Sequence, residues 1–497
     1  MDLDPTTMSA VRLAHAIRHR VLSAVEVVSA YVERAEKVNP LLNAIVTPRF
    51  DEARREAAAL DRALAAGRSV GPLAGVPFTA KDVLATAGVR TTSGSQLFRD
   101  HVPATDATAV ARLRAAGAIL LGKTNASEFA MDIQTDNLVF GPTRNPWDLR
   151  RTSGGSSGGD SAAVAAGCCA LGIGTDYGGS LRWPAHCTGT LALRPTAGRV
   201  PGTGHLPSLS PLDPPAPNSA ALHGQLHVVG PLGRTVDDLE VALRVLAGPD
   251  NRDPYTVPVP LHDSAEVDVR RLRFAWCDGD GSVPVRADVA AVVDAVAERL
   301  GHLGCDVIQQ RPAALDGAEA LYTRLRGMDG LAEWRQLAAG QEDQLSPHLK
   351  TLLAGAREAT VGAMLAASLE RDRRRAQLLD FLDDRPVLLL PVAVLPAFPL
   401  GQRSFHIDGC DVGYFQVVAP CRAVTLFGLP AVAVPCGRSQ EGLPLAVQVV
   451  AGPFQEHVAL AVARLLEQEF GGWSPPPSVL SVTKQLSRGP QHPLRPA

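Results

Sequence analysis

The sequence lacks three features that would place it in a specialised class of protein. Its longest apolar runs, such as residues 387–390, are far shorter than the roughly 20 residues of a membrane-spanning helix. Its 8 cysteines in 497 residues form no dense framework and no pair of CxxC motifs, which is typical of reduced thiols and argues against zinc. The formal net charge is only −3, so the charge balance favours neither a nucleic acid nor an anionic membrane as partner.

An export signal is also missing from the first residues. MDLDPTTMSA begins acidic and has no basic segment followed by an apolar run, so we expect a cytoplasmic protein. With 46% hydrophobic and 20% charged residues, the composition is that of an ordinary globular protein with a large core. The small net charge suits small neutral substrates better.

The chain alternates between helical and strand-like patterns. Residues 1–70 are expected to form a helical segment that packs on the core, because apolar residues recur at helical spacing in 8–67. From Pro72 onwards short apolar strands alternate with helices, which predicts an α/β fold with a central mixed β-sheet flanked by α-helices. We predict a main domain over 71–473, with its core motifs in 71–200, a β-α-β-like insertion at about 270–312, and a Pro-rich tail over 474–497.

Two motifs suggest ligands that their surroundings do not support. Residues 117–124 fit the pattern GxxxxGKT of a phosphate-binding loop, but the four intervening residues are apolar and predict a buried strand. DGDGS at 278–282 lacks the ligand spacing of a calcium loop, and no HExxH occurs. We therefore expect neither a cofactor nor a metal.

Three segments carry the strongest signal for function. KDV at 81–83, GGSSGGD at 154–160 and GTDYGGSLRWPAHCTG at 174–189 together resemble the amidase signature family. The resemblance continues in the family order through residues 120–148 and through GLPAVAVPCG near the C-terminus. It therefore extends along most of the chain.

The resemblance implies a Ser-cis-Ser-Lys triad. By motif position, Lys81 is the base, Ser156 is the bridging serine after a cis peptide bond, and Ser180 is the nucleophile. A serine hydroxyl is a weak nucleophile and needs an adjacent base, and Lys81 can serve only when it is neutral. Burial beside hydroxyl groups would lower its pKa, and Asp82 should point to the opposite face of the strand.

The residues around the nucleophile have expected supporting roles. The glycine-rich turn Tyr177-Gly178-Gly179-Ser180 should aim backbone N–H groups at the oxyanion, and Tyr177, where the family often has threonine, could form an aromatic wall of the pocket. Asp176 and Arg182 are expected to form a supporting ion pair.

Two further positions stand in the glycine-serine run. We assign Ser157 to the oxyanion and substrate-binding set, with a structural hydrogen bond to the loop backbone as its expected contact. Asp160 is a departure from the small residue or glutamate that is usual in the family.

The predicted function is hydrolysis of a carboxamide C–N bond of a small molecule, a linear amide, through an acyl-enzyme. The segment 120–148 also resembles the glutaminase subunit of a tRNA-dependent amidotransferase, which is the first alternative. A non-catalytic protein that uses the fold to bind a ligand or partner is the second. The oligomeric state stays open, with a homodimer as the commonest form.

Overall fold

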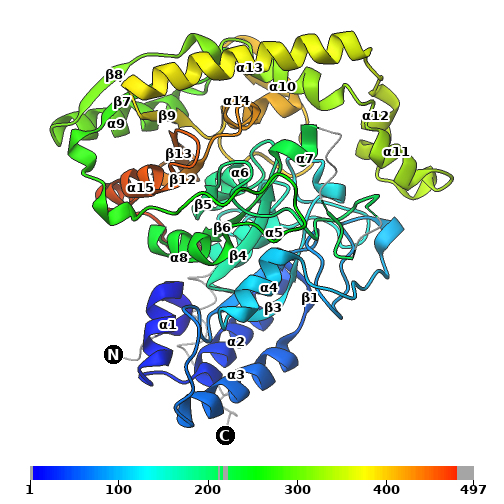
Figure 1. The fold of residues 1–497 in the computed structure, drawn as a ribbon, viewed down its shortest axis with the longest axis vertical. Coiled ribbons are helices and arrows are strands. Elements are labelled where there is room, and N and C mark those ends of the chain that lie inside the picture. Colours follow the sequence, from blue (N-terminus) through cyan, green and yellow to red (C-terminus); the bar gives the residue numbers. More distant parts are fainter. Residues whose placement is uncertain (1–3, 211–212, 217–221, 478–497) are drawn as a thin grey trace, which may run out of the picture.

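The computed structural model describes residues 4–210, 213–216 and 222–477, which surround one large β-sheet (Figure 1). Its 11 strands lie in the order β1-β3-β2-β4-β6-β5-β12-β13-β9-β7-β8. In chain order they are β1 (Ile45–Pro48), β2 (Pro77–Lys81), β3 (Ile119–Thr124), β4 (Leu171–Asp176), β5 (Leu191–Arg194), β6 (Val228–Gly233), β7 (Arg273–Trp276), β8 (Asp306–Gln309), β9 (Val387–Pro391), β12 (Ala431–Arg438) and β13 (Pro444–Ala451). A separate hairpin joins β10 (Phe405–Ile407) to β11 (Cys410–Val412).

The large sheet combines parallel and antiparallel strand pairs. β2 runs parallel to both β3 and β4, and β7 runs parallel to both β8 and β9. The other neighbouring pairs are antiparallel. The predicted α/β fold with a central mixed sheet is therefore confirmed.

Helices pack on both faces of the sheet. They are α1 (Ala10–Arg18), α2 (Ala24–Leu42), α3 (Phe50–Ala65), α4 (Thr108–Ala115), α5 (Gly158–Ala165), α6 (Arg182–Thr188), α7 (Leu222–Leu226), α8 (Val236–Leu246), α9 (Ala287–His302), α10 (Ala318–Gly327), α11 (Ala332–Ala338), α12 (Pro347–Gly355), α13 (Val361–Asp384), α14 (Ala419–Leu426) and α15 (Glu456–Phe470). In Figure 1, α1–α3 lie at the foot of the molecule and α13 runs along its top.

The side chains of β9 show how the two faces of the sheet are filled. Val387 and Leu389 join the larger apolar core, to which α8, α9 and α15 contribute. Leu388 and Leu390 point to the other face, where α10, α13 and α14 pack. This alternation follows from the period of two in a strand, and burial of both faces explains why VLLLP is apolar throughout.

The N-terminal 70 residues contribute a strand as well as helices. Ser23 and Glu26 form a capping box that begins α2, as helix-capping chemistry predicts. Between α2 and α3, however, β1 pairs with β3 as an edge strand of the central sheet. This segment is therefore continuous with the sheet, which the helical pattern alone did not indicate.

The region of the expected insertion contains β7, α9 and β8, with β7 and β8 parallel at one edge of the sheet. Most of the Pro-rich tail, residues 478–497, lies outside the described residues. The GxxxxGKT segment ends in β3, where the buried Lys123 donates hydrogen bonds to the carbonyl oxygen of Leu84 and the hydroxyl of Thr86. Its lysine is thus part of the protein interior.

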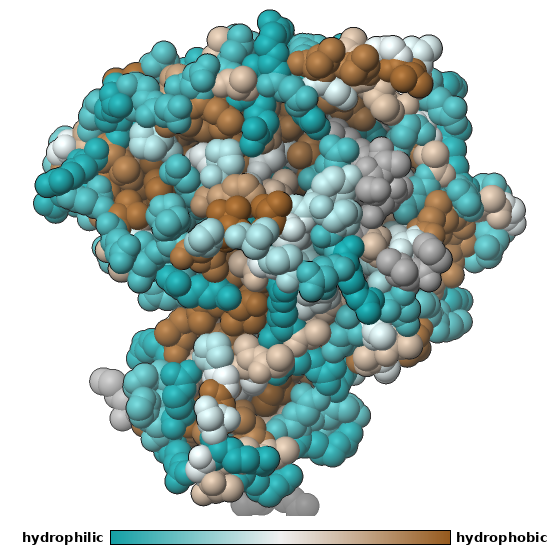
Figure 2. Space-filling model, viewed as in Figure 1, coloured by the Kyte–Doolittle hydropathy of each residue, from teal (hydrophilic) through white to brown (hydrophobic). Residues whose placement is uncertain are grey.

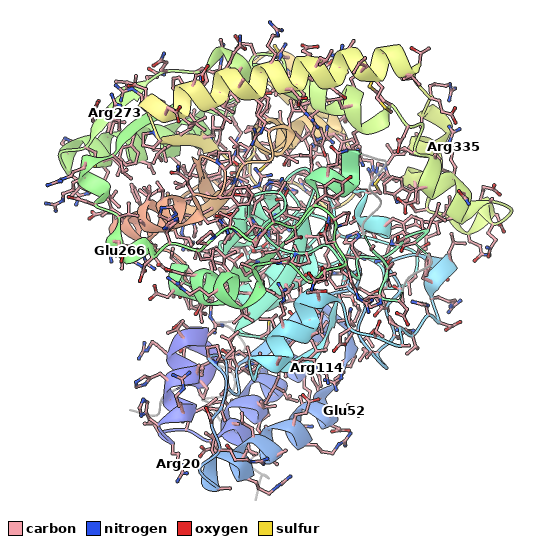
Figure 3. The ribbon with its side chains drawn as sticks, viewed as in Figure 1. Arg20, Glu52, Arg114, Glu266, Arg273 and Arg335 are labelled. Atoms are coloured by element: carbon pink, nitrogen blue, oxygen red, sulfur yellow. The ribbon has the colours of Figure 1, made fainter. Side chains whose placement is uncertain are left out.

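Polar side chains cover most of the face shown in Figure 2. Charged residues such as Arg20, Arg273 and Arg335 extend outward from the ribbon in Figure 3. Apolar residues are exposed along the first half of α13, including Val361, Leu365 and Leu369. No helix within the described ranges is long and apolar enough to cross a membrane.

Truncation of Leu389 tests how much the burial of β9 between two layers of helices contributes to the free energy of unfolding. We expect Leu389→Ala to lower the free energy of unfolding by about 2–5 kcal/mol, because its fully buried side chain would leave a cavity. Leu365→Ala is the matched control, since that leucine is 59% exposed and should cost less than about 0.5 kcal/mol. Urea denaturation followed by tryptophan fluorescence measures both, and equal midpoints would contradict the assignment of β9 to the core.

Candidate active site

Lys81 is the last residue of β2, and its side chain lies beneath the glycine-serine loop. Its Nζ atom is 2.6 Å from Oγ of Ser156 and 2.8 Å from Oγ1 of Thr175. The Gly155–Ser156 peptide bond is cis, as the resemblance implies. β2 and β4 are parallel neighbours, so their carboxyl ends bring Lys81 and Thr175 to the same edge of the sheet.

The surroundings of Lys81 favour its neutral form. The side chain is fully buried, and burial lowers the pKa of Lys81 to about 7, although the carboxylates of Asp160 and Asp176 oppose this shift. Neither carboxylate is within ion-pair distance of the amine, whose contacts are hydroxyl groups. A neutral amine at hydrogen-bonding distance from a serine can accept a proton near neutral pH.

Ser180 lies in the loop between β4 and α6 and is partly exposed. Its carbonyl oxygen accepts a hydrogen bond of 3.2 Å from the backbone N–H of Ser157, so the two serine loops are in direct contact. The Ser180 hydroxyl makes no hydrogen bond with the part of the chain that the structure describes. Of the three predicted triad residues, Ser180 is thus the one whose side chain is not fully buried.

Close packing explains two of the glycines near these serines. A methyl group in place of a Gly155 hydrogen would lie 2.7 Å from the backbone nitrogen of Gln134. At Gly174 it would lie 2.6 Å from Oγ of Ser157. That Ser157 hydroxyl is fully buried and donates to the carbonyl oxygen of Thr175 at 3.2 Å, so it supports the loop from inside and does not face the open side of the site.

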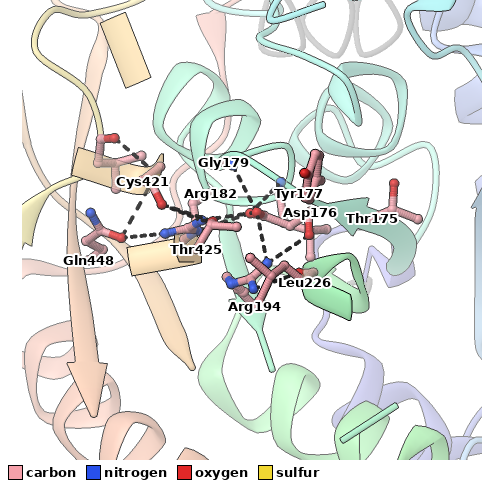
Figure 4. Close-up of polar contacts among 12 residues, drawn as sticks. Thr175, Asp176, Tyr177, Gly179, Arg182, Arg194, Leu226, Cys421, Thr425 and Gln448 are labelled. Atoms are coloured by element: carbon pink, nitrogen blue, oxygen red, sulfur yellow. Dashed lines mark hydrogen bonds and ion pairs between the residues drawn. The ribbon is translucent and has the colours of Figure 1, made fainter. Parts of the chain in front are cut away.

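Asp176 holds the Ser180 loop through a buried ion pair (Figure 4). Arg182 Nη2 is 3.0 Å from Asp176 Oδ1, and both side chains are fully buried. Arg194 adds a second cation, 3.3 Å from the same oxygen. Burial by itself raises the pKa of Asp176, but the two guanidinium groups together with hydrogen bonds hold it far below its usual range.

Arg182 also connects this loop to distant parts of the fold. Its guanidinium group donates to Oε1 of Gln448 on β13 at 2.8 Å, and to Oγ1 of Thr425 on α14 at 2.8 Å (Figure 4). The ion pair proposed from the sequence is therefore the centre of a larger network.

One donor of the predicted oxyanion turn is already used. The N–H of Gly179 donates to Oδ1 of Asp176 at 2.9 Å, because the carboxylate lies beneath the turn. This corrects the expectation that all N–H groups from 177 to 180 point at substrate. The N–H groups of Gly178 and Ser180 have no partner within the described residues. The ring of Tyr177 packs against Tyr322, with centroids 5.6 Å apart.

A second group of buried charges lies behind Lys81. Asp82 accepts a hydrogen bond from the backbone N–H of Thr92 at 3.0 Å, and burial raises the pKa of Asp82 to about 6, against the influence of Lys123. Asp160 accepts a bond of 3.4 Å from Thr79, and burial raises the pKa of Asp160 to about 7.

Sequence reasoning missed Thr175 and Arg194. Thr175 could have been found from its position near the end of the strand next to the one that carries Lys81. Arg194 has no such local signal, because it reaches Asp176 from β5, which is not adjacent to β4 in the sheet.

Comparison with known proteins shows the family to which the chain belongs. The family model described as Amidase matches residues 26–460. The chain is 34% identical to a glutamyl-tRNA(Gln) amidotransferase subunit from Thermosynechococcus vestitus, over 90% of this chain and 94% of that protein. It is 33% identical to human fatty-acid amide hydrolase 2, over 94% and 90% of the two chains.

Solved structures give the same result. A 6-aminohexanoate cyclic dimer hydrolase in complex with substrate matches with a TM-score of 0.84 and 28% identity, covering 96% of this chain and all of that one. A bacterial aryl acylamidase of the amidase signature family matches with a TM-score of 0.84 and 27% identity, over 96% and 98% of the chains. The chain belongs to the amidase signature family, whose hydrolases act on C–N bonds.

Removal of Arg182 tests the buried network. We expect Arg182→Ala to lower the free energy of unfolding by about 3–5 kcal/mol, because it leaves the buried Asp176 carboxylate only partly compensated. Arg311→Ala is the control, since its ion pair with Asp316 is exposed and should contribute less than about 1 kcal/mol. Urea denaturation distinguishes the two, and a loss for Arg182→Ala as small as that of the control would refute a central role for the ion pair.

Proposed function

We propose that the protein is a free-standing amidase that hydrolyses a linear carboxamide through Lys81, Ser156 and Ser180. The observation that carries this proposal is the buried Lys81 amine, 2.6 Å from the Ser156 hydroxyl, with a pKa lowered to about 7. The partly exposed Ser180 on the adjoining loop is the group that a substrate can reach. Together they provide a base, a proton relay and a nucleophile.

In the first half of the proposed reaction, neutral Lys81 accepts a proton from Ser156, which takes one from Ser180. The Ser180 oxygen attacks the carbonyl carbon, and the N–H groups of Gly178 and Ser180 stabilise the negative charge that develops on the carbonyl oxygen. Ser156 then donates its proton to the departing amine and recovers one from Lys81. An acyl-enzyme on Ser180 remains.

Water completes the proposed cycle through the same proton relay. A water molecule gives a proton through Ser156 to Lys81 and attacks the ester carbon, after which the Ser180 oxygen leaves and is protonated. The product acid departs, and all three groups return to their starting protonation states.

The second candidate is the glutaminase subunit of a tRNA-dependent amidotransferase, because the chain is 34% identical to a protein of that kind over most of its length. The two functions differ in their need for other chains. Steady turnover of simple aryl amides by the purified chain would support a free-standing amidase. Turnover of glutamine only after addition of partner subunits would support the amidotransferase.

The nucleophile can be identified by covalent labelling. We expect intact-mass spectrometry to show one adduct after treatment of the wild-type protein with a fluorophosphonate, and none with Ser180→Ala or Lys81→Ala. Amide hydrolysis by Ser180→Ala should fall by about 10⁴-fold or more, since loss of a nucleophile removes the covalent route.

Ser282→Ala is the matched control, because the Ser282 hydroxyl donates a hydrogen bond to Asp280 at 2.7 Å and has no assigned role in the proposed triad. It should label like the wild type. An adduct that persists in Ser180→Ala would refute this assignment, and a wild-type protein that never labels or turns over an amide would favour a non-catalytic binding protein.

The pKa of Lys81 predicts the pH dependence of hydrolysis. The base works only when it is neutral, so kcat/KM should rise with pH below about 7 and become constant above it. The Asp160 carboxylate favours charged Lys81. Asp160→Asn should therefore lower the pKa of Lys81 and move the rising limb to lower pH, while the exposed control Glu298→Gln leaves it in place. A limb that stays fixed in Asp160→Asn would show that Asp160 does not act on Lys81.

A further inference from the structure

A cavity of about 550 Å³ lies among helices from the C-terminal half of the chain, beyond the segments that carry Lys81, Ser156 and Ser180. Its walls come from α10, α12, the turn at residues 413–416 and the start of α14. Apolar side chains form much of the lining, and three charged groups accompany them. The residues that matter here are Glu319, Arg326, Leu331, Leu352, Phe415 and Arg422.

Helix α10, which contributes to the cavity wall, contacts the loop that carries Ser180. Tyr322 on α10 donates a hydrogen bond of 2.7 Å to the carbonyl oxygen of Tyr177. A methyl group on Gly178 would lie 2.8 Å from the Tyr322 hydroxyl and 3.7 Å from Cγ of Arg422. Arg422, which lines the cavity, therefore also lies close to the oxyanion turn.

Two guanidinium groups converge on one aromatic ring in this wall. The Cζ atom of Arg422 is 4.6 Å from the ring centroid of Phe415, and that of Arg326 is 5.5 Å from it. Only Arg422 has a carboxylate partner in the described chain, Glu319, at 2.7 Å. The Nε atom of Arg422 is buried without a hydrogen-bond partner among the described residues, and the residue is only 4% exposed.

Arg326 has no carboxylate within ion-pair distance among the described residues. Its contacts are the ring of Phe415 and Sδ of Met131, at 3.2 Å from its Nη2 atom. Arg326 thus connects α10 to Met131, which directly precedes the backbone segment 132–134 that packs on Gly155. With Arg422 and Glu319, the wall carries two positive charges and one negative charge.

We infer that this cavity binds a carboxylate group of the substrate, through Arg326 and the free edge of Arg422. The electrostatic attraction between a partly desolvated cation and an anion is strongest when the anion enters the same cavity. Guanidinium groups bind carboxylates with two parallel hydrogen bonds. One net positive charge matches a monoanionic carboxylate better than a dianionic phosphate. Leu331 and Leu352 suit a short apolar spacer, so the substrate class is an amide that bears a carboxylate at the end of such a spacer. The inference rests on the proposed amidase function.

Binding of matched probes to a non-hydrolysing protein tests the inference. In a Ser180→Ala background, isothermal titration calorimetry compares succinyl-, glutaryl- and adipyl-4-nitroanilide with their methyl esters. We expect at least one acid to bind about tenfold or more tightly than its ester, because the ester has lost the charge that Arg326 recognises. Adding Arg326→Gln should bring the two dissociation constants together, and Arg326→Lys should keep part of the difference.

Arg324→Gln is the matched control, since Arg324 lies on the same helix but is exposed and paired with Glu370 at 2.6 Å. It should leave the preference for the acid intact. If no acid binds more tightly than its ester, or if the preference survives Arg326→Gln, the inference is wrong and these arginines only hold α10 against Phe415. Because binding is measured without turnover, that result is independent of whether a fluorophosphonate labels Ser180.

Discussion

The buried carboxylate of Asp176 is the constraint on which the rest of the site depends. It lies at the end of β4 and accepts hydrogen bonds from the backbone of Gly179 and Leu181, while Arg182 and Arg194 neutralise its charge. A charge with no access to water is tolerable only with such compensation, so the turn cannot rearrange without exposing or stranding it. The same contacts fix where α6 begins, and with it the position of Ser180.

As the proposed base, Lys81 has to satisfy two requirements that oppose each other. It must be buried to lose its proton near neutral pH, yet it must keep contacts that orient the amine. Hydroxyl groups meet both needs, since Ser156 and Thr175 bind the nitrogen without attracting a positive charge as a carboxylate would. The adjacent Asp82 is bound by Thr92 instead, and it lies close enough to Lys123 for each of these two charges to shift the pKa of the other.

The motifs predicted the parts of the site that lie close in sequence to glycine and serine signals. The alternation of strands and helices also predicted the mixed sheet. The four-residue β1 was missed because it lies between two helices and has no alternating pattern of its own. Arg194 and Gln448 were missed for a different reason. They reach the site from distant elements, and only the packing of the sheet brings them there.

The positions of the proposed catalytic residues and of the cavity wall along the chain affect how the protein can evolve. Every group assigned to bond cleavage comes from residues 81–182, whereas the cavity wall comes from residues 319–422. Under the proposed function and the proposed carboxylate site, the reaction and the choice of substrate are encoded in two separate stretches of the gene. If both proposals hold, mutations in the second stretch would change the acyl or amine group of the substrate while leaving the proton relay intact, so the protein could acquire new substrates through changes in its outer helices.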